Sequence, residues 1–478
     1  LSNWPIFFTG NFGREPLFIY LLAVMQALFG PSNLTLRLLP ALIGALFTPA
    51  LAWLGWELGP SLGIRNRERF SLWSGLAILA MLWGQIFSRY VIRAGLFTLI
   101  EILLWASLWR AWRSNALRWW ALSGLLAGLS FYTYLPARLL PLVLVPMLVL
   151  ALWRYRQQFR GRITGMLLGL GIGIIVAAPL AVYFVRNPLS FSTRTEQVLV
   201  QGQGIASLLW KNTLATLGMA FIEGDANIRN NIPARPVLDW LMLSLFFIGL
   251  VNLIGHLLRP AALFLLSWLV VMLLPTILSD YAPAFHRAIG AMPVFALLIA
   301  LGLEKMTSWV GNRWPSVRQW VVALAWVMLF LSIFITWRAF TAWSASPGLF
   351  YARDVGFQQL ADILSEEMDG QRVYVSPRGS EHPTVRSLLL ANGASPEHHG
   401  FDGRICVRVP TDIAANFVFL TQEDSRGPEL VSSYLPGSAI DPLIQDVDGK
   451  EWAIILHKPA RRTVRFPEMD GQPVALSD

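Results

Sequence analysis

Residues 34–58 read LTLRLLPALIGALFTPALAWLGWEL, an almost uninterrupted apolar run. A helix of about 20 predominantly apolar residues is long enough to cross a hydrocarbon core of roughly 30 Å. Similar runs recur, and we expect spans at roughly 34–58, 70–89, 94–110, 117–135, 138–153, 164–185, 237–256, 261–279, 288–304 and 319–340. The pattern predicts a mainly α-helical polytopic transmembrane bundle of about ten spans.

The composition of the 478-residue chain supports a membrane protein, because 55% of the residues are hydrophobic and only 14% are charged. Soluble domains carry about 25% charged residues. The 21 Trp and 28 Phe residues fit a bundle with aromatic belts at both interfaces. The net charge of +9 does not indicate a nucleic-acid partner, since the Arg residues cluster in short loops between spans.

The Cys and His residues give no sign of a metal or other cofactor. Cys406 is the only cysteine, which excludes an intramolecular disulfide and a cysteine-based zinc site. His398 and His399 are adjacent, and paired histidines without a third ligand are typical of a protein surface. We therefore expect no bound metal and no cofactor.

The charge of the loops predicts the orientation in the membrane, because cytoplasmic loops are enriched in Lys and Arg. The Arg-rich loops 64–70, 109–120, 153–162, 256–260 and 304–320 fall on one side, which we assign to the cytoplasm. The other side receives 88–93, 132–138, 186–236, 279–287 and everything after about 341. This predicts an integral protein of the cytoplasmic membrane, with the N-terminus of this chain and its C-terminal domain extracytoplasmic.

Residues 16–30, PLFIYLLAVMQALFG, are short for a span. If they crossed the membrane, every later basic loop would be inverted. We therefore expect a helix that lies along the outer interface. Residues 1–33 would then be the remainder of a first outer loop, and since the sequence begins with Leu1, we expect the natural N-terminus upstream.

The chain divides into a transmembrane domain, 1–340, and a soluble tail, 341–478. The transmembrane domain includes a long polar outer loop, 186–236. In the tail, 372–376, 404–409, 416–420 and 451–456 have the pattern of strands, whereas 354–368 and 382–393 have the pattern of helices. We expect a small extracytoplasmic α/β domain of about 130 residues.

The predicted outer side carries more Arg than the positive-inside rule allows. These residues are Arg14, Arg89, Arg93, Arg138, Arg186, Arg229, Arg235 and Arg287. A phosphate ligand would explain the excess, because a guanidinium offers a planar fork of donors that matches phosphate. For Arg89 and Arg93, which would share one helical face if this end of the span is helical, the alternative is contact with lipid headgroups.

His286 and Arg287 are the strongest phosphate candidates, since we expect them at the start of an outer-side helix, where an anion is favoured. Tyr134 and Arg138 lie near a span end and would contact a sugar and a phosphate, unless they only anchor an aromatic belt. Glu101 lies deeper in a span, where a polar contact between helices is the favoured interpretation.

GREPLFIYLLAVMQALFG (13–30) followed by LTLRLLPALIGAL (34–46) resembles a signature of the protein O-mannosyltransferase and aminoarabinose transferase group. These are integral membrane glycosyltransferases of the C superfamily (GT-C). The matching residues are Arg14, Pro16, Leu17, Tyr20, Phe29, Gly30, Arg37 and Leu38. The blocks SRYVIRAG (88–95), YTYLPARLLP (132–141) and HRAIGAMP (286–293) also resemble bacterial members, so the likeness covers roughly 1–340.

The resemblance implies a polyprenyl-phosphate sugar as donor, a hydroxyl of a protein, lipid or glycan as acceptor, and inversion at the anomeric carbon. We expect Arg287, His286 and Arg138 to bind the donor phosphate. Arg14, Glu15, Arg89, Arg93 and Tyr134 would line the donor cavity, with Arg14 as the simplest partner of Glu15.

Two departures from the family pattern concern catalysis. The family's base is an Asp upstream of the Arg-Glu-Pro-Leu block, yet residues 1–13 contain no carboxylate. We therefore expect the base before Leu1 and assign no catalytic residue within the chain. Many relatives also carry an Asp where this sequence has Ala94.

Two other functions remain open at this point. A transporter or flippase for lipid-linked glycans would also need outward Arg residues, but it should show polar residues deep within several spans. Glu101 is the mid-depth charge that we find. A non-catalytic assembly or sensor protein, with the tail as its binding module, is the third possibility.

Overall fold

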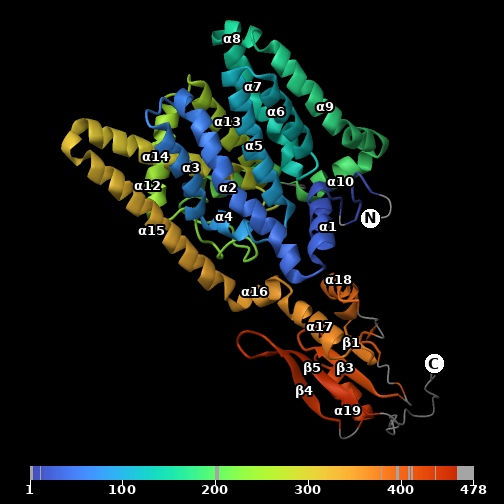
Figure 1. Ribbon diagram of the computed structural model, residues 1–478. Helices are drawn as coiled ribbons and strands as arrows, with labels where there is room; N and C mark the ends of the chain where they lie inside the picture. Colours follow the sequence, from blue (N-terminus) through green and yellow to red (C-terminus); the bar gives the residue numbers. More distant parts are fainter. Residues whose placement is uncertain are drawn as a thin grey trace. The chain divides into compact units, whose positions relative to one another are not determined.

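The computed structural model describes residues 4–10, 12–199, 204–377, 379–393, 398–406, 410, 413–435 and 438–459. The chain forms two compact units, Leu1–Trp343 and Ser344–Asp478. We call them the membrane unit and the tail unit and describe each by itself (Figure 1).

The membrane unit is helical throughout. Its α-helices are α1 (Leu17–Phe29), α2 (Asn33–Leu62), α3 (Arg67–Ala77), α4 (Leu82–Phe87), α5 (Arg93–Ser114), α6 (Leu117–Ser130), α7 (Leu140–Arg154), α8 (Arg156–Arg160), α9 (Ile163–Arg186), α10 (Pro188–Val198), α11 (Ile205–Gly218), α12 (Trp240–Ile254), α13 (Pro260–Ile277), α14 (Met292–Arg313) and α15 (Arg318–Ser344). Short 3-10 helices connect some of them: η1 (Ile78–Ala80), η2 (Leu135–Leu139), η3 (Ile289–Ala291) and η4 (Pro315–Val317).

Seven helical segments of the described chain are long and apolar enough to cross a membrane. They are Asn33–Leu62, Arg93–Ser114, Leu135–Arg154, Ile163–Arg186, Pro260–Ile277, Ile289–Arg313 and Pro315–Ser344. They confirm an integral membrane protein. The predicted spans 70–89, 117–135 and 237–256 are shorter or broken: α3, η1 and α4 share the first, whereas α6 and α12 have 14 and 15 residues. Apolar composition alone does not fix where a helix ends.

Glycines let two pairs of helices approach closely. A Cβ added to Gly124 of α6 would meet the backbone of Gly169 on α9, and one added to Gly249 of α12 would meet the backbone of Leu298 on α14. Small residues at such crossings are how membrane helices gain packing contacts without a hydrophobic driving force. These two pairs therefore depend on the absence of a side chain.

The Arg-rich loops of the membrane unit are joined to one another at one end of the bundle. Arg259 Nη1 donates to the Leu62 carbonyl at 2.8 Å, and Arg162 Nε donates to the Trp112 carbonyl at 2.7 Å. Ion pairs join Arg113 to Glu57 and Arg69 to Glu304 at the same end. We call this end, formed by 56–69, 109–118, 154–163, 255–260 and 304–318, the arginine-rich end. Its assignment to the cytoplasm stays a prediction.

α1 lies at the opposite end, which we call the loop end. The Leu17 N–H donates to the Tyr132 carbonyl at 3.0 Å, and the Tyr20 hydroxyl donates to the Pro5 carbonyl at 2.7 Å. Phe18 is the buried residue of this 13-residue helix, which is too short to span a bilayer. An interfacial position remains the prediction for it.

The tail unit is an α/β domain built on one five-stranded sheet. Its elements are α16 (Pro347–Ala352), α17 (Val355–Glu366), β1 (Val373–Ser376), η5 (Gly379–Glu381), α18 (Pro383–Ala391), β2 (His398–Gly400), β3 (Ala415–Leu420), α19 (Gly427–Tyr434), β4 (Ile440–Gln445) and β5 (Glu451–Lys458). The strand order is β2-β1-β3-β5-β4; β1 pairs in parallel with β2 and β3, and β5 is antiparallel to β3 and β4. This confirms the small α/β domain predicted from the alternating pattern.

Alternate residues of β1 and β3 point to opposite faces of the sheet. Val375 packs into a core with Leu360 of α17, whereas Tyr374 packs into a second core with Val431 of α19. The strand predicted at 404–409 is wrong where it is described: the Asp402 carbonyl accepts the N–H groups of Ile405 and Cys406, which makes a turn. Residues 407–409 lie outside the described part.

Candidate functional site

His286 and Arg287 lie in a turn at the loop end. The sequence predicts both at the start of a helix, but this placement is wrong by a few residues, because η3 begins at Ile289 and α14 at Met292. The Arg287 N–H closes the turn by donating to the Ala284 carbonyl at 3.0 Å. The two side chains are therefore held by a loop rather than by a helix N-terminus.

The peptide groups of Phe285, next to His286, are fixed on both sides. Its N–H donates to Asp225 Oδ2 at 2.8 Å, and its carbonyl accepts the indole N–H of Trp83 at 3.1 Å. Asp225 comes from the loop between α11 and α12, and Trp83 comes from α4. Two segments that are distant in the sequence thus fix the backbone next to His286.

Asp225 is the buried carboxylate of this site, with an exposed fraction of 0%. Besides Phe285, it accepts the backbone N–H of Asn227 at 2.8 Å and the side-chain amide of Asn230 at 3.1 Å. Burial raises the pKa of Asp225, and these hydrogen bonds and the charge of Arg287 offset part of the rise. The sequence marks this loop as polar but does not indicate that Asp225 contacts the 278–288 loop.

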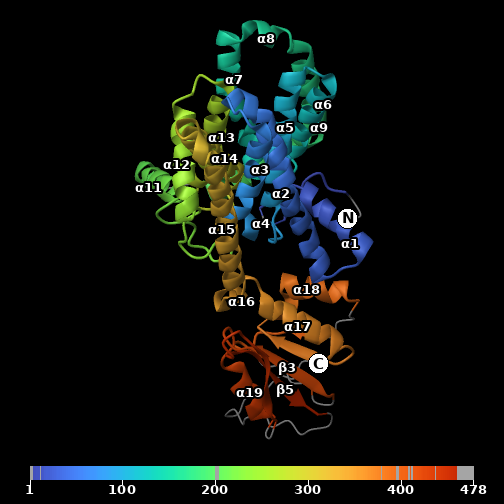
Figure 2. The same ribbon diagram turned by 60° about the vertical axis from the view of Figure 1, so that its left-hand side comes forward.

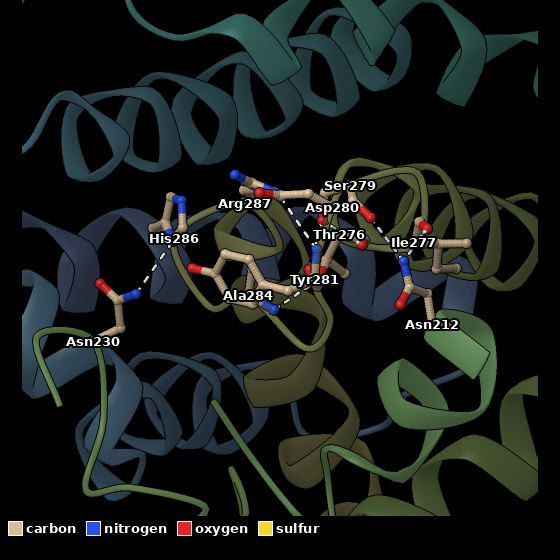
Figure 3. Close-up of polar contacts among 10 residues, drawn as sticks. All are labelled: Asn212, Asn230, Thr276, Ile277, Ser279, Asp280, Tyr281, Ala284, His286 and Arg287. Carbon is tan, nitrogen blue, oxygen red and sulfur yellow. Dashed lines mark hydrogen bonds and ion pairs between the residues drawn. The ribbon is translucent and has the colours of Figure 1, made fainter. Parts of the chain in front are cut away.

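Asn230 links Asp225 to His286. Its Nδ2 lies 3.2 Å from His286 Nδ1 and 3.1 Å from Asp225 Oδ2 (Figure 3 shows the contact with His286). The carboxylate can only accept, so it fixes the amide with its NH₂ group toward both partners. His286 Nδ1 then accepts a hydrogen bond, and the neutral imidazole carries its proton on Nε2.

Arg287 forms an ion pair with Asp280, and its guanidinium carbon lies 5.0 Å from the ring centre of Tyr281 (Figure 3). The Arg287 side chain is 14% exposed, whereas that of Asp280 is 58% exposed. Burial raises the pKa of Tyr281 to about 12, and the charge of Asp225 adds to the rise. Arg287 is thus a half-buried cation whose partner carboxylate faces solvent.

The loop that carries these residues is anchored by side chains of α11 and α13. Asn212 Nδ2 donates to the carbonyls of Ile277 and Ser279, at 3.1 and 2.7 Å. The Ala284 N–H donates to the Thr276 hydroxyl at 2.8 Å. Figure 3 shows these contacts, which attach the loop to α11 and α13 ahead of the Arg287 turn.

A second cluster at the loop end contains Glu15, Arg93 and Tyr134. Glu15, which is 4% exposed, forms an ion pair with Arg93, the first residue of α5. The Arg93 guanidinium carbon lies 5.9 Å from the ring centre of Tyr134. The expected pairing of Glu15 with Arg14 is wrong, because the Glu15 carboxylate points to a residue 78 positions away; Arg14 Nη1 instead donates to the Gly13 carbonyl at 2.9 Å.

Arg138 borders a cavity of about 600 Å³ at the loop end. Its Nη1 donates to the Phe191 carbonyl at 3.0 Å and to the Thr195 hydroxyl at 3.2 Å, and its guanidinium carbon lies 4.1 Å from the Phe191 ring centre. The rest of the lining is apolar and consists of Phe131, Ala177, Leu180, Ala181, Phe184, Val185, Pro188 and Phe191. The cavity thus combines one cation with hydrocarbon walls.

Arg89 does not share a helical face with Arg93, contrary to the expectation from their spacing. α4 ends at Phe87 and α5 begins at Arg93, so the chain between them is not helical. Arg89 Nη1 donates to Gln85 Oε1 at 3.1 Å, and its guanidinium carbon lies 4.6 Å from the ring centre of Phe340 on α15. The structure therefore directs Arg89 toward α15.

The two clusters lie at the same end of the bundle, because η2 packs against α13 and η3 packs against α5. Between these helices, Glu101 accepts the indole N–H of Trp268 at 2.6 Å in a fully buried position. This is the polar contact between helices that the sequence favours for Glu101.

No protein-family profile and no curated protein matches this chain. Among solved structures, it is similar to ArnT from Cupriavidus metallidurans in the apo state, with 14% identity over 93% of this chain and 87% of that one, at a TM-score of 0.54. ArnT bound to undecaprenyl phosphate matches with 14% identity over 93% and 88% of the two chains, at a TM-score of 0.53. The apo oligosaccharyltransferase of Archaeoglobus fulgidus is a weaker match, with 13% identity over 92% of this chain and 64% of that one, at a TM-score of 0.48. At such identity the likeness concerns the fold alone, and the chain has the GT-C fold of the aminoarabinose transferase ArnT, as its sequence motifs imply.

Proposed function

We propose that this protein is a membrane glycosyltransferase that moves a sugar from a polyprenyl-phosphate donor to a hydroxyl of a protein, lipid or glycan on the extracytoplasmic side. The main support for the proposal is the turn that carries His286 and Arg287, whose backbone is fixed by Asp225 and Trp83. The chain also shares its fold with ArnT. One of the ArnT structures holds undecaprenyl phosphate, which is a polyprenyl phosphate without a sugar.

The turn suits the leaving group of such a reaction. The acceptor oxygen attacks the anomeric carbon and the bond from that carbon to the phosphate oxygen breaks, so the electron pair and the growing charge go to the lipid phosphate. Arg287 and the Nε2–H of His286 are donors for this charge, and the fixed backbone of the turn that carries them limits the reorganisation that binding requires. The acceptor proton goes to a base on the opposite side of the carbon, which inverts its configuration.

The cavity beside Arg138 suits the isoprenoid chain of the donor. Its volume of about 600 Å³ and its apolar lining favour a hydrocarbon, and Arg138 supplies a cation at the same place. Arg138 is also coupled electrostatically to Glu15, which belongs to the second cluster. We therefore propose that Arg138 contacts the phosphate and that Arg14, Arg93, Glu15 and Tyr134 line the remainder of the donor cavity.

We assign the base to none of the carboxylates described at the loop end. Glu15 is buried in its ion pair with Arg93, and Asp225 is buried beneath its hydrogen-bond donors. Asp280 is accessible, but its pairing with Arg287 puts it on the phosphate side of the sugar. The resemblance implies an Asp upstream of Arg14 as the base, and we propose none of these three carboxylates for that role.

A transporter or flippase for lipid-linked glycans is the alternative. Such a protein needs a polar path through the bundle, whereas Glu101, at mid-depth, is fully buried and bonded to Trp268. This observation favours a reaction at one end of the bundle over passage through it.

The experiment incubates membranes that contain the full-length protein with radiolabelled polyprenyl-phosphate sugars and a panel of acceptors. The proposal predicts sugar transfer with release of polyprenyl phosphate, and loss of both in an Arg287→Ala variant. Translocation of the intact donor across sealed vesicles, without release of polyprenyl phosphate, would favour the flippase. No transfer from any donor by folded protein would contradict the proposal.

A further inference from the structure

A second cavity of the membrane unit lies at the arginine-rich end, away from the proposed donor site. It has a volume of about 620 Å³ and shares no lining residue with the cavity beside Arg138. Side chains of α2, α5, α7, α8 and α13 line it, and Figure 2 shows α8 bridging α7 and α9 at this end. The reaction proposed above does not use it.

The wall formed by α7 faces hydrocarbon. Leu144 and Leu148 line the cavity and are 38% and 44% exposed in the chain itself. Trp109 of α5 and Phe264 of α13 face them from the other side and are buried. Since α7 belongs to a membrane span, the exposed side chains meet lipid rather than water. An apolar chain is the occupant that such walls favour.

The polar rim of the cavity is positively charged. Arg259 is part of the lining and is held there by its hydrogen bond to the Leu62 carbonyl. Lys305 of α14 is close enough for the two positive charges to act on one another. The neighbouring carboxylate, Glu304, is already in an ion pair with Arg69 at 2.8 Å. An anion at Arg259 would offset this excess of positive charge.

α8 adds further cations at the rim. Tyr155, Gln158 and Phe159 line the cavity, whereas Arg156 and Arg160 lie one helical turn apart on another face and are exposed. Neither takes part in an ion pair with the carboxylates that the structure describes. Basic side chains beside a membrane helix attract anionic lipid headgroups.

We propose that this cavity binds an anionic phospholipid of the bilayer, with an acyl chain between α5, α7 and α13 and the headgroup phosphate at Arg259. A zwitterionic lipid would bring its own cation to an already positive rim, so the site discriminates by headgroup charge. The bound lipid would contact both α8 and α7 and so stabilise the packing of α8. This inference does not rest on the proposed transferase activity.

The test uses the full chain in phosphatidylcholine nanodiscs, with phosphatidylglycerol or phosphatidylcholine probes that carry a diazirine in the acyl chain. After irradiation, mass spectrometry measures labelling of the peptides from α5 and α7. The phosphatidylglycerol probe should label them about fivefold more than the phosphatidylcholine probe, as expected for one lost headgroup contact. Equal labelling by the two probes would overturn the proposal.

Two variants distinguish the contribution of the Arg259 charge to lipid binding from that of the apolar cavity. Arg259→Gln should lower phosphatidylglycerol labelling about fivefold and leave phosphatidylcholine labelling unchanged. Its control is Arg118→Gln, an exposed arginine at the same end that does not line the cavity. Leu148→Trp should fill the cavity and lower labelling by both probes, whereas Leu142→Trp, on the same helix but outside the lining, should not.

A polyprenyl-phosphate diazirine probe completes the design. If it labels the same peptides and phosphatidylglycerol does not displace it, the cavity serves the donor chain and the proposal is wrong. An Arg259→Gln variant that labels like the unmodified protein would also contradict it. Displacement of the polyprenyl probe by phosphatidylglycerol would support it.

Discussion

Asn230 Nδ2 lies 3.2 Å from His286 Nδ1, and the same nitrogen donates to the buried carboxylate of Asp225. The carboxylate therefore fixes the amide, and the amide fixes the imidazole. A proton on His286 Nδ1 would meet an N–H group instead of an acceptor. This arrangement holds His286 as a neutral donor through Nε2 at the proposed phosphate site.

An Asn230→Ala variant should give donor binding a new pH dependence. The substitution removes the N–H group that opposes a proton on His286 Nδ1, so the imidazole can become cationic as the pH falls. A charged His286 would bind phosphate more tightly, so the ratio of Kd at pH 8 to Kd at pH 6 for polyprenyl phosphate should rise above that of the unmodified protein. Titration of the lipid phosphate itself affects both proteins alike.

Asn227→Ala is the control, because the Asn227 side chain accepts the Arg229 N–H and its backbone N–H still reaches Asp225. It should leave the ratio of the two Kd values unchanged. If Asn230→Ala and the unmodified protein share the same ratio, Asn230 does not control the proton on His286.

The phenol of Tyr281 should lose its proton at a higher pH than an unperturbed tyrosine. Its pKa is raised to about 12, with burial as the largest cause, whereas an unperturbed phenol has a pKa of about 10. The neutral phenol therefore contributes stability that is complete below about pH 10 and is lost as the pH rises through about 12. In an absorbance titration, a Tyr281→Phe variant should lack a component near pH 12 and retain the rest. Loss of a component near pH 10 would contradict the assignment.

Replacing only one residue of the buried ion pair between Glu15 and Arg93 should destabilise the protein. Arg93→Ala leaves the Glu15 carboxylate buried without its partner, which should lower the free energy of unfolding by about 3–5 kcal/mol. The double variant Glu15→Gln/Arg93→Ala removes the charge as well and should recover part of this loss. Tryptophan fluorescence during thermal unfolding measures both, and equal losses would show that the charge is not buried as described.

We expect Asp280 to weaken phosphate binding, because its exposed carboxylate forms an ion pair with Arg287 and competes with the phosphate for the guanidinium. Asp280→Asn releases the guanidinium and removes a negative charge, so polyprenyl phosphate should bind roughly two- to fivefold more tightly, as expected for a partly exposed pair. Glu223→Gln is the control, because Glu223 is an exposed carboxylate in the loop between α11 and α12. Weaker binding by Asp280→Asn would show that Asp280 supports the site instead.

The sequence predicts the membrane fold because long apolar runs have few alternatives to a helix in lipid. It also predicts the loop at 88–93, which the structure has between α4 and α5. It does not predict where α5 begins, so the shared helical face that the spacing allows for Arg89 and Arg93 is wrong. The pairing of Glu15 with Arg93 was missed because a charge next in the chain is the simplest partner only while the fold is unknown.

Part of the candidate site was also predictable. Arg287 and His286 stand out because arginine is unexpected on the outer side of a span. Asp225 could not be predicted, because its role depends on the N–H group of Phe285, which lies 60 positions further along the chain. Contacts between distant loops leave no periodic pattern in a single sequence.

Binding of polyprenyl phosphate to the chain in phosphatidylcholine nanodiscs tests the central claim most directly. Arg287→Ala should weaken it by about tenfold or more, as expected for a lost charge-assisted hydrogen bond. Arg186→Ala removes an exposed arginine from the loop-end terminus of α9 and should change the Kd less than about twofold. Equal effects of the two substitutions, or no binding by the unmodified protein, would contradict a lipid-phosphate site at the His286–Arg287 turn.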